Sequence, residues 1–526
     1  MPHGSSILTG GLEEVFRPVT LPSGAVLPNR LVKVAMYEHL AALFGGPPTP
    51  SHLSLYAQWA GGGWGMIVTG NIQISADHLT LGRDMVIPET VTRESLRPFV
   101  ALAQAMKAPR NITVGQDASD TEPFSGHPSV LMQLSHAGRQ SPSFIGGRLP
   151  FIPSLAPSPI RVGSSASSAK PRDGWLSNII WRALFPIPRP MTVVDIQRVV
   201  DRFVEGARVA LEAGFDGVQI HASHGYLIAQ FISPKTNERD DAYNVRDAPL
   251  RLLHEVVIAI RSAVPSSFIL GVKVNSADYF GAGGRFVFDG DAEDASEKSA
   301  LDHVIEMASW GLLDFIEISG GDYESPDFGA TDRQAFFSRF SRKALAAIKS
   351  LPSSSPRHRP LVVLTGGLQT PANLTDALSN GHADLLGIGR GSVLCPDLPR
   401  RLQKCISESL HQESPSTDRS MPLEDTVADA FPGPPDLAVR ESRTTRVAFS
   451  LLTTLGVLPL PKLIGAGAGM AWYTVMMSRL AKGRPIDYKI GAAGGIVRMW
   501  AAEVQIVSVA LIVIILYTAW TMTFFS

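Results

Sequence analysis

Short apolar runs alternate with helix-like stretches from about residue 31 to residue 410, and this alternation most constrains the fold. The runs that we expect to be strands are residues 31–36, 66–71, 130–135, 217–221, 269–275, 314–319, 361–365 and 384–389. Most are apolar throughout, as are strands buried on both faces of a parallel sheet. Eight strand–helix units in about 380 residues predict an α/β fold, a (β/α)₈ TIM barrel, with a doubly wound sheet as the alternative.

The clearest helical pattern between these strands covers residues 195–213. Its apolar residues recur every three or four positions, as on the buried face of an amphipathic helix; they are Ile196, Val199, Val200, Phe203, Ala207, Ala210 and Leu211. Gly214 follows directly and suits the position after a helix end. We therefore expect a helix over this segment.

Two long stretches interrupt the alternation and predict insertions into the barrel. Residues 109–128 are polar and turn-rich, and residues 142–190 are rich in proline and serine. Loops of this length are usually functional, so we expect a lid or a partner surface. Residues 411–440, rich in proline, serine and acidic residues, predict a linker that follows a barrel domain of residues 1–410.

The chain ends in an uncharged apolar segment, residues 504–525, within a hydrophobic, helical extension of residues 441–526. At 1.5 Å per residue this helix would be roughly 33 Å long, enough to cross a hydrocarbon core of about 30 Å. We expect a single membrane-spanning C-terminal anchor; the alternative is a buried core helix. An earlier apolar zone, residues 447–477, could be a hairpin, an interfacial segment or a further span.

Basic residues precede the expected span and predict its orientation. They are Lys482, Arg484, Lys489 and Arg498. Because basic residues flank membrane helices on the cytoplasmic side, we expect the barrel to face the cytoplasm.

Composition narrows the other functional classes. The formal net charge is −1 and no long basic run occurs, so we expect no nucleic-acid partner. The two cysteines, Cys395 and Cys405, cannot build a disulfide framework or supply the four thiolates of a typical iron–sulfur cluster. No G-x-G-x-x-G segment follows a strand, so we expect no resident nicotinamide in a Rossmann site.

Polar residues follow the predicted strands at the ends where a barrel carries its functional groups. The third strand leads into residues 133–140 (QLSHAGRQ), and the fourth leads into His221, His224 and Tyr226. Gly366 and Gly367 follow the seventh strand, and Gly389 and Arg390 follow the eighth. Backbone N–H groups and a cation at the last two strand ends often bind phosphate, so we predict a phosphate site there. The alternative is two tight turns that need glycine.

Lys273 is a charge within an apolar strand. Burial of an unpaired charge is costly, so we expect a negative partner. A bound anion or a reduced cofactor would serve, and the alternative is a salt bridge inside the barrel.

His221 and His224 are three residues apart at a strand end and admit two uses. They could bind a metal, but no third ligand follows at a convincing spacing. They could instead donate hydrogen bonds to one carbonyl oxygen and polarise it for attack. Tyr226 could then give or take a proton. We expect no metal; the remaining alternative is a set of satisfied polar residues in a turn.

Together these segments resemble the Old Yellow Enzyme family of NAD(P)H-dependent flavin oxidoreductases. The resemblance extends over about residues 16–410 and is closest to the bacterial and fungal branch with a His-x-x-His pair. It is carried by LPNRLVKVAM (27–36), GMIVTGN (65–71), QLSHAGRQ (133–140), GFDGVQIHASHGYLIAQFISPKTNERDD (214–241), GVKVNSADY (271–279), LTGGLQTP (364–371) and GIGR (387–390).

The resemblance implies a tightly bound, non-covalent FMN. The first strand would line the flavin ring with Val34, Ala35, Met36 and Tyr37. Asn71 and Gln133 would hydrogen-bond the pyrimidine edge, and Lys273 would face N1 and O2. The phosphate would be held by Gly366, Gly367, Gly389 and Arg390. Tyr37 replaces the small threonine or cysteine of many relatives, so it should alter the reduction potential or narrow the pocket.

The implied reaction is reduction of an activated C=C bond in an α,β-unsaturated carbonyl compound. NADPH or NADH would deliver hydride to flavin N5 and leave, and the enone would then bind in the same place. His221 and His224 would hold its oxygen, and Tyr226 would protonate its α-carbon. The alternatives are an oxidation or aromatisation on the same scaffold, or a membrane-tethered flavin protein without turnover. The long insertions favour a bulky, specialised metabolite as substrate, and a homodimer is compatible with the sequence.

Overall fold

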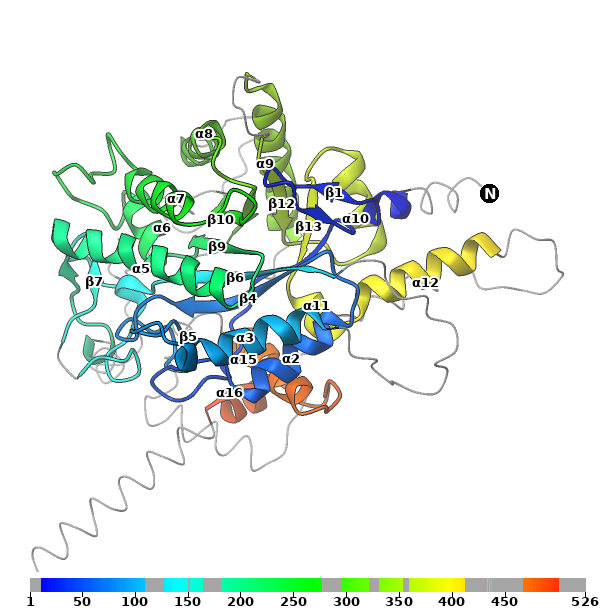
Figure 1. Cartoon of the computed structure of the whole chain (residues 1–526), viewed down its shortest axis with the longest axis horizontal. Helices are drawn as coiled ribbons and strands as arrows, with labels where there is room; N and C mark the ends of the chain where they lie inside the picture. The colour runs from blue at the N-terminus through cyan, green and yellow to red at the C-terminus, as the bar shows by residue number, and fades with distance from the viewer. Residues whose placement is uncertain are drawn as a thin grey trace, which may run out of the picture.

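The computed structural model describes residues 11–108, 127–149, 152–163, 182–276, 295–320, 331–352, 359–411, 433, 435, 437 and 467–500. Eight of its strands form one closed parallel barrel (Figure 1). They are β3 (Leu31–Lys33), β4 (Met66–Gln73), β6 (Ser129–Ser135), β9 (Gly217–Ala222), β10 (Ile269–Asn275), β11 (Phe315–Ser319), β12 (Leu361–Thr365) and β13 (Leu385–Ile388). Pairing of β3 with both β13 and β4 closes the barrel, so the predicted (β/α)₈ fold and its strands are confirmed.

Helices follow the strands and pack around the barrel. The main ones are α2 (Pro50–Ala60), α3 (Arg93–Lys107), α5 (Val193–Glu212), α7 (Arg251–Ala263), α8 (Ala295–Ser309), α9 (Thr331–Ser350), α10 (Pro371–Ser379) and α12 (Leu398–His411). Short helices α6 (Leu227–Ile232) and α11 (Arg390–Leu394) and a 3₁₀ turn, η1 (Gly138–Gln140), lie at strand ends. The helix predicted over residues 195–213 is confirmed as α5, which begins at a capping box of Thr192 and Asp195.

A hairpin closes the N-terminal end of the barrel. It consists of antiparallel strands β1 (Val19–Thr20) and β2 (Val26–Leu27). Leu21 and Leu27 are buried in one apolar cluster with side chains of the barrel strands, including Val68, Leu131 and Phe315. Apolar side chains therefore fill the interior of the barrel at this end, and we expect the functional site at the C-terminal end.

The described part of the second insertion forms compact structure beside the third strand. Residues Leu155–Ala156 (β7) pair with Arg189–Pro190 (β8). Buried Arg148 donates hydrogen bonds to the Ser141 hydroxyl at 2.8 Å and to the Ser141 carbonyl at 2.8 Å. The strand pairing and these hydrogen bonds hold the described part of the insertion in a defined conformation beside the barrel. A further strand, β5 (Met85–Val86), extends the sheet beside β4, and most of the predicted insertion at 109–128 lies outside the described residues.

Two helices of the C-terminal extension pack against the barrel. Helix α15 (Gly467–Ala481) lies beside α2, and α16 (Ala492–Met499) packs on α15 (Figure 1). Trp472 and Met476 are fully buried there, and the Trp472 indole donates to the Ile490 carbonyl at 2.8 Å. Part of the apolar zone 447–477 is thus a helix on the barrel surface.

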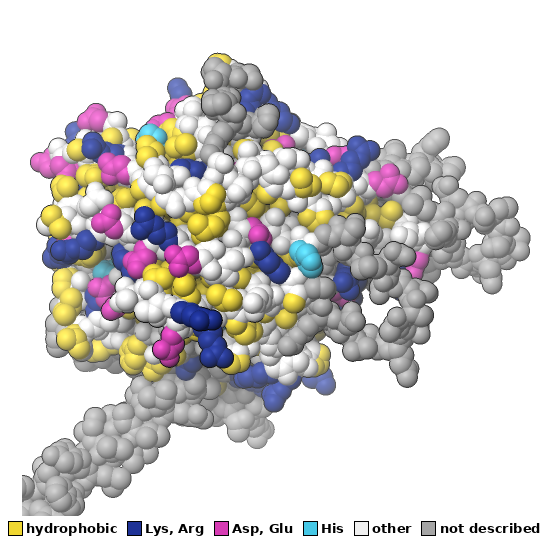
Figure 2. Space-filling model, viewed as in Figure 1, with side chains coloured by type: hydrophobic (Ala, Val, Ile, Leu, Met, Phe, Trp, Pro, Cys, Tyr) yellow, Lys and Arg dark blue, Asp and Glu magenta, His cyan; other side chains and the backbone are white. Residues whose placement is uncertain are grey.

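The predicted span at 504–525 and most of the linker 411–440 lie outside the described residues. Among the helices that the structure does describe, none combines the length and apolarity needed to cross a membrane. The membrane anchor and the cytoplasmic orientation stay predictions. On the face shown in Figure 2, basic and acidic side chains lie interspersed, in keeping with a net charge near zero.

Candidate active site

The inward-facing side chains change from apolar to polar along the barrel strands. On β6 the sequence of inward positions is Leu131, Gln133 and Ser135, and on β11 it is Phe315, Glu317 and Ser319. Every second residue of a strand points to the same face, so one strand supplies both layers. The polar layer lies at the C-terminal ends, where the sequence predicts the site.

A chain of hydrogen bonds crosses the polar layer. Gln133 donates from Nε2 to Gln219 Oε1 at 2.6 Å, and Gln219 donates to Glu317 Oε2 at 2.7 Å. The Lys273 ammonium lies 2.9 Å from Glu317 Oε1, which also accepts the Thr365 hydroxyl at 2.8 Å. All but Thr365 are buried. The negative partner expected for Lys273 is therefore Glu317, as in the alternative of a salt bridge inside the barrel.

His221 presents a hydrogen-bond donor at the rim of the barrel. Its Nδ1 accepts the Ser223 backbone N–H at 3.3 Å, which assigns the ring proton to Nε2. Burial, and then the nearby His224 and Lys273, lower the pKa of His221 well below its usual value. The imidazole is neutral at pH 7 and can donate from Nε2.

His224 is held at the same rim by contacts to three strand ends. Its backbone has a left-handed φ of 57°, and its N–H donates to Asn275 Oδ1 at 3.2 Å. Gln140 Nε2 donates to the His224 carbonyl at 3.0 Å, and the His224 Nε2 lies 3.2 Å from the Ser319 hydroxyl. Burial lowers the pKa of His224 well below its usual value, so Nδ1 can donate once Nε2 accepts from Ser319.

Tyr226 completes this group of side chains. It immediately precedes α6, and its ring centroid is 4.5 Å from that of His221, whose centroid is 5.2 Å from that of His224. The Asn71 amide donates to the phenol oxygen at 3.2 Å, and Thr80 forms a further hydrogen bond with it. Burial raises the pKa of Tyr226 well above its usual value, so the phenol keeps its proton at neutral pH.

The two strand ends predicted to hold phosphate lie next to the first strand. Gly366 and Gly367 have φ angles of 119° and 76°, which side chains rarely allow. A Cβ at Gly389 would lie 3.6 Å from Val34 and 3.8 Å from the Met36 sulfur. The structure thus brings the first and last strand ends together, with Arg390 exposed beside them.

The structure contains a buried cluster of charged residues behind the first strand that the sequence analysis did not predict. The Lys33 ammonium lies 4.0 Å from the centroid of the Trp59 ring. Glu38 accepts the Tyr56 hydroxyl at 2.5 Å and the Gly70 N–H at 3.0 Å. Burial lowers the pKa of Lys33 to about 7, and the Glu38 charge opposes that shift. Glu38 therefore fixes the loop that carries Met36 and Tyr37.

The sequence-predicted residues lie on or next to one rim, but their supporting residues were missed. The missed group consists of Glu317, Gln219, Thr80, Asn275, Ser319 and Glu38. Glu317 could have been predicted from the sequence, because it is a charged residue within an apolar strand, as is Lys273. The others are ordinary polar residues in the sequence, and only their positions give them a role.

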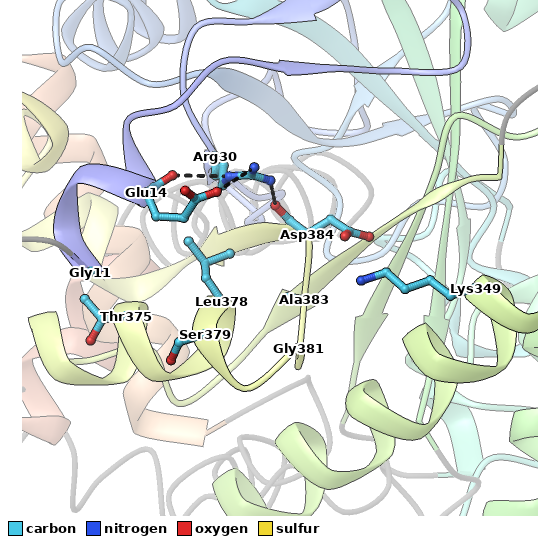
Figure 3. Close-up of a pocket in the computed structure, with 10 residues that line it drawn as sticks. All are labelled: Gly11, Glu14, Arg30, Lys349, Thr375, Leu378, Ser379, Gly381, Ala383 and Asp384. Carbon is cyan, nitrogen blue, oxygen red and sulfur yellow. Dashed lines mark hydrogen bonds and ion pairs between the residues drawn. The ribbon is translucent and has the colours of Figure 1, made fainter.

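A cavity at the other end of the barrel is separate from this site (Figure 3). Its volume is about 340 Å³. Arg30, just before β3, donates to the Asp384 carbonyl at 3.0 Å and to Glu14 Oε1 at 2.9 Å. Because these residues precede their strands, the cavity lies at the N-terminal end of the barrel, where contacts usually serve stability.

Comparison with known proteins identifies the family. A sequence model of the NADH:flavin oxidoreductase / NADH oxidase family matches residues 127–409. The chain belongs to this family. An NADH-dependent flavin oxidoreductase, iliE, of Neonectria sp. (strain DH2) is 32% identical over 76% of this chain and 48% of that protein. The iliE protein of Hypocrea jecorina (strain QM6a) is 30% identical over 73% of this chain and 87% of the relative.

The fold of this flavin oxidoreductase matches that of solved relatives. The Old Yellow Enzyme homologue from Zymomonas mobilis superposes with a TM-score of 0.55 at 22% identity, over 80% of this chain and 99% of that one. The superposition confirms the fold, and the family match confirms the predicted family of flavin oxidoreductases. The protein is an oxidoreductase, and its cofactors are FMN and NAD(P)H. The first relative is about twice as long as the matched region, and the extension at 467–500 lies beyond the family match.

The described residues fit an FMN at the C-terminal rim. Gly366 and Gly367 have positive φ angles, a backbone conformation found in turns whose N–H groups bind phosphate. The Ser135 hydroxyl is buried on the inward face and has no hydrogen-bond partner among the described residues. Buried hydroxyls are rarely left unpaired, so a polar ligand group is expected near it. The individual FMN contacts of Asn71, Gln133 and Lys273 stay predictions.

Acid should destabilise this flavin oxidoreductase through its buried histidines. Burial, and for His39 the Arg83 charge also, lowers the pKa of His39 and His52 to about 3. Between the unfolded value near 6.5 and about 3, the unfolded chain binds protons that the folded chain does not. The contribution of each histidine to the free energy of unfolding should therefore be at its maximum above pH 6.5. Below pH 6.5 the free energy of unfolding should fall by up to about 1.4 kcal/mol per pH unit for each of the two histidines.

Urea titrations at several pH values would measure this slope. His52→Gln removes one titrating group and should flatten the slope below pH 6.5. An unaltered slope in His52→Gln would show that His52 is not neutral in the folded state.

Proposed function

We propose that this protein reduces the C=C bond of an α,β-unsaturated carbonyl compound with NADH or NADPH and bound FMN. The observation that carries the proposal is the group of three side chains at one rim. The rings of His221, His224 and Tyr226 lie within 5.2 Å of a neighbour in the group. Two of them are neutral donors and the third retains a proton, which is the set that this reaction needs.

The two histidines bind the carbonyl oxygen of the substrate. His221 donates from Nε2, because Ser223 fixes its other nitrogen as an acceptor. His224 donates from Nδ1 while Nε2 accepts from Ser319. Negative charge develops on this oxygen as the β-carbon is reduced, so each well-placed donor can stabilise the transition state by about 3–4 kcal/mol.

Tyr226 gives its proton to the α-carbon of the substrate. Asn71 donates to the phenol oxygen at 3.2 Å, and Thr80 is bonded to the same atom. Since Thr80 already accepts from Gln73 at 2.9 Å, its own hydroxyl proton can stabilise the phenolate that remains. The phenol proton is then directed to the substrate rather than to a neighbouring side chain.

FMN, when bound, supplies the hydride chemistry, since it can be reduced by the nicotinamide and reoxidised by the substrate. Lys273 offers the charge that would favour its reduced form, and Glu317 holds that ammonium in place at 2.9 Å. Gly366, Gly367, Gly389 and Arg390 would hold its phosphate. Val34, Ala35, Met36 and Tyr37 would line its ring.

The test follows the flavin colour under argon. NADH or NADPH is expected to bleach the purified protein near 450 nm, and cyclohexenone is expected to restore the colour. Bleaching without recovery would favour another acceptor, such as one used in oxidation or aromatisation chemistry. A yellow protein that does not bleach would favour a flavin-binding protein without turnover, and a colourless, cofactor-replete protein would remove the proposal.

We also propose that the uncharged segment 504–525 anchors the protein in a membrane, with the barrel on the cytoplasmic side. Trp500 is the last described residue and contacts the rim of the barrel through His39. Only three residues separate it from the proposed span, so the chain allows at most roughly 14 Å between Trp500 and the start of that span. A lipophilic enone could then pass from the bilayer to the site.

Truncation after Trp500 is the matched test of this anchor. The chain 1–500 is expected to leave the membrane fraction and remain yellow. The chain 1–440 is expected to aggregate, because removal of Trp472 and Met476 exposes apolar surface of the barrel. Cell fractionation and the flavin spectrum report both results. If the 1–500 protein stays in the membrane pellet, the assignment of the anchor is wrong.

A further inference from the structure

The C-terminal helices lie outside the family match yet share the core of the barrel. Residues of α15 and α16, among them Trp472, Met476 and Met499, belong to the same apolar cluster as Tyr56 and Trp59 of α2. The Gln58 amide donates to the Leu480 carbonyl across this interface. Within the extension α16 packs closely on α15, because a Cβ at Gly495 would lie 3.2 Å from the Trp472 backbone. The extension is therefore a fixed part of the described structure.

The end of α16 reaches the loop after the first strand. The Trp500 and His39 ring centroids are 5.4 Å apart with an edge-on angle of 68°. His39 Nδ1 lies 3.0 Å from the Tyr37 hydroxyl, and these two ring centroids are 5.6 Å apart. A continuous chain of three aromatic rings thus joins the extension to Tyr37.

A second contact reaches the last strand end. Helix α15 packs against α11, which begins with Arg390. Tyr473 of α15 is buried and lies close enough to Arg390 for the guanidinium charge to act on its phenol. The extension therefore contacts the loop after the first strand, which would line the flavin ring, and the helix after the last strand, which begins with the proposed phosphate ligand Arg390.

We propose that the C-terminal extension is part of the FMN site, and that Trp500, through His39, positions Tyr37 beside the flavin. This inference rests on the proposed placement of FMN at the rim. Trp500 and His39 are positioning residues that act through Tyr37, and Tyr37, which would line the flavin ring, sets the environment and width of the site. The extension thereby tunes the flavin and the access of the substrate.

The backbone conformation of His39 explains why this residue needs the contact with the Trp500 ring. Its φ is 57°, in the left-handed region that non-glycine residues avoid. Such a residue keeps this conformation only when its surroundings hold it. Burial lowers the pKa of His39 to about 3, so its ring is neutral. Its Nδ1 can then accept a hydrogen bond from the Tyr37 hydroxyl. Without the Trp500 ring the loop loses packing on one side, and Tyr37 can shift.

The test uses the full-length holoprotein with Trp500→Ala, Tyr37→Ala and the double variant. Trp500→Ala should shift the reduction potential of bound FMN and change the KM of the enone by roughly threefold to tenfold, which lies within the range of coupling between residues in one contact network. In the Tyr37→Ala background the same substitution should have no further effect on either quantity. Trp500→Phe retains an aromatic ring and should restore most of the wild-type behaviour.

The matched control is Trp310→Ala. Trp310 stacks on His254 with ring centroids 4.4 Å apart, between α7 and α8 on the outside of the barrel, and its loss should leave potential and KM unchanged. Equal effects of the two tryptophan variants, or additive effects in the double variant, would overturn the inference. If Trp500→Ala does not fold, the same cycle with Trp500→Leu, which removes the aromatic ring but keeps an apolar side chain, decides. A wild-type protein without flavin would instead overturn the proposed function.

Discussion

Tyr226→Phe is expected to lower the rate of enone reduction by about 10²–10⁴, the usual contribution of a general acid. The ring stays in place, because its packing against His221 at 4.5 Å does not need the hydroxyl. Only the transferable proton is lost, so reduction of FMN by NADH should be unchanged. Stopped-flow measurement of the two half-reactions separates these steps.

Tyr243→Phe is the matched control for Tyr226→Phe. Tyr243 is also a buried tyrosine after the fourth strand, but its hydroxyl donates to Glu255 at 2.9 Å. Its loss should leave both half-reactions near wild-type rates. Because burial raises the pKa of Tyr226, the wild-type oxidative half-reaction should also show no loss from Tyr226 ionisation up to at least pH 9. Equal enone rates in Tyr226→Phe and wild type would assign the proton to another group.

Lys273→Met is expected to lower the free energy of unfolding by about 3–5 kcal/mol, because it leaves a buried carboxylate without its cation. The Lys273 and Glu317 side chains are only 5% and 1% exposed. The double variant Lys273→Met, Glu317→Gln removes both charges and should recover most of the stability. Urea unfolding of the FMN-free protein measures these differences without a contribution from the ligand.

Arg261→Met is the control that breaks a buried ion pair away from the proposed FMN site. Arg261 and Asp314 form another buried pair, 2.6 Å apart with side chains 6% and 0% exposed, at the N-terminal end of the barrel. Its loss should also destabilise the protein but leave the reduction potential of FMN unchanged, whereas Lys273→Met should lower that potential. A Lys273→Met protein as stable as wild type would show that Glu317 is neutral in the fold.

Much of the fold follows from local sequence patterns. The strand at residues 269–275 and the helix at 195–213 were predictable because burial on two faces demands an apolar run and burial on one face demands helical spacing. The rim residues were predictable for a related reason. Barrel strands place their C-terminal ends together, so polar residues after several strands must meet.

The partners of those residues were set by tertiary structure. Glu317 reaches Lys273 only because β10 and β11 pair with these two residues in register. Thr80 reaches Tyr226 and Ser319 reaches His224 from positions far away in the chain. No local pattern encodes such distances, because they depend on the register and closure of the whole barrel.

The sequence by itself determined the barrel, its family and the side chains offered at its rim, because each depends on residue type and spacing along the chain. Only the tertiary structure decided which of these groups pair and where the extension docks. Trp500 and Tyr37 are 5.4 Å and 5.6 Å, by ring centroids, from the same His39 ring, although more than 450 residues separate them in the chain. That contact exists because α15 buries its apolar face on α2. The hydrophobic effect depends on the apolar area removed from water and not on the distance between residues along the chain, so the sequence alone does not reveal this docking.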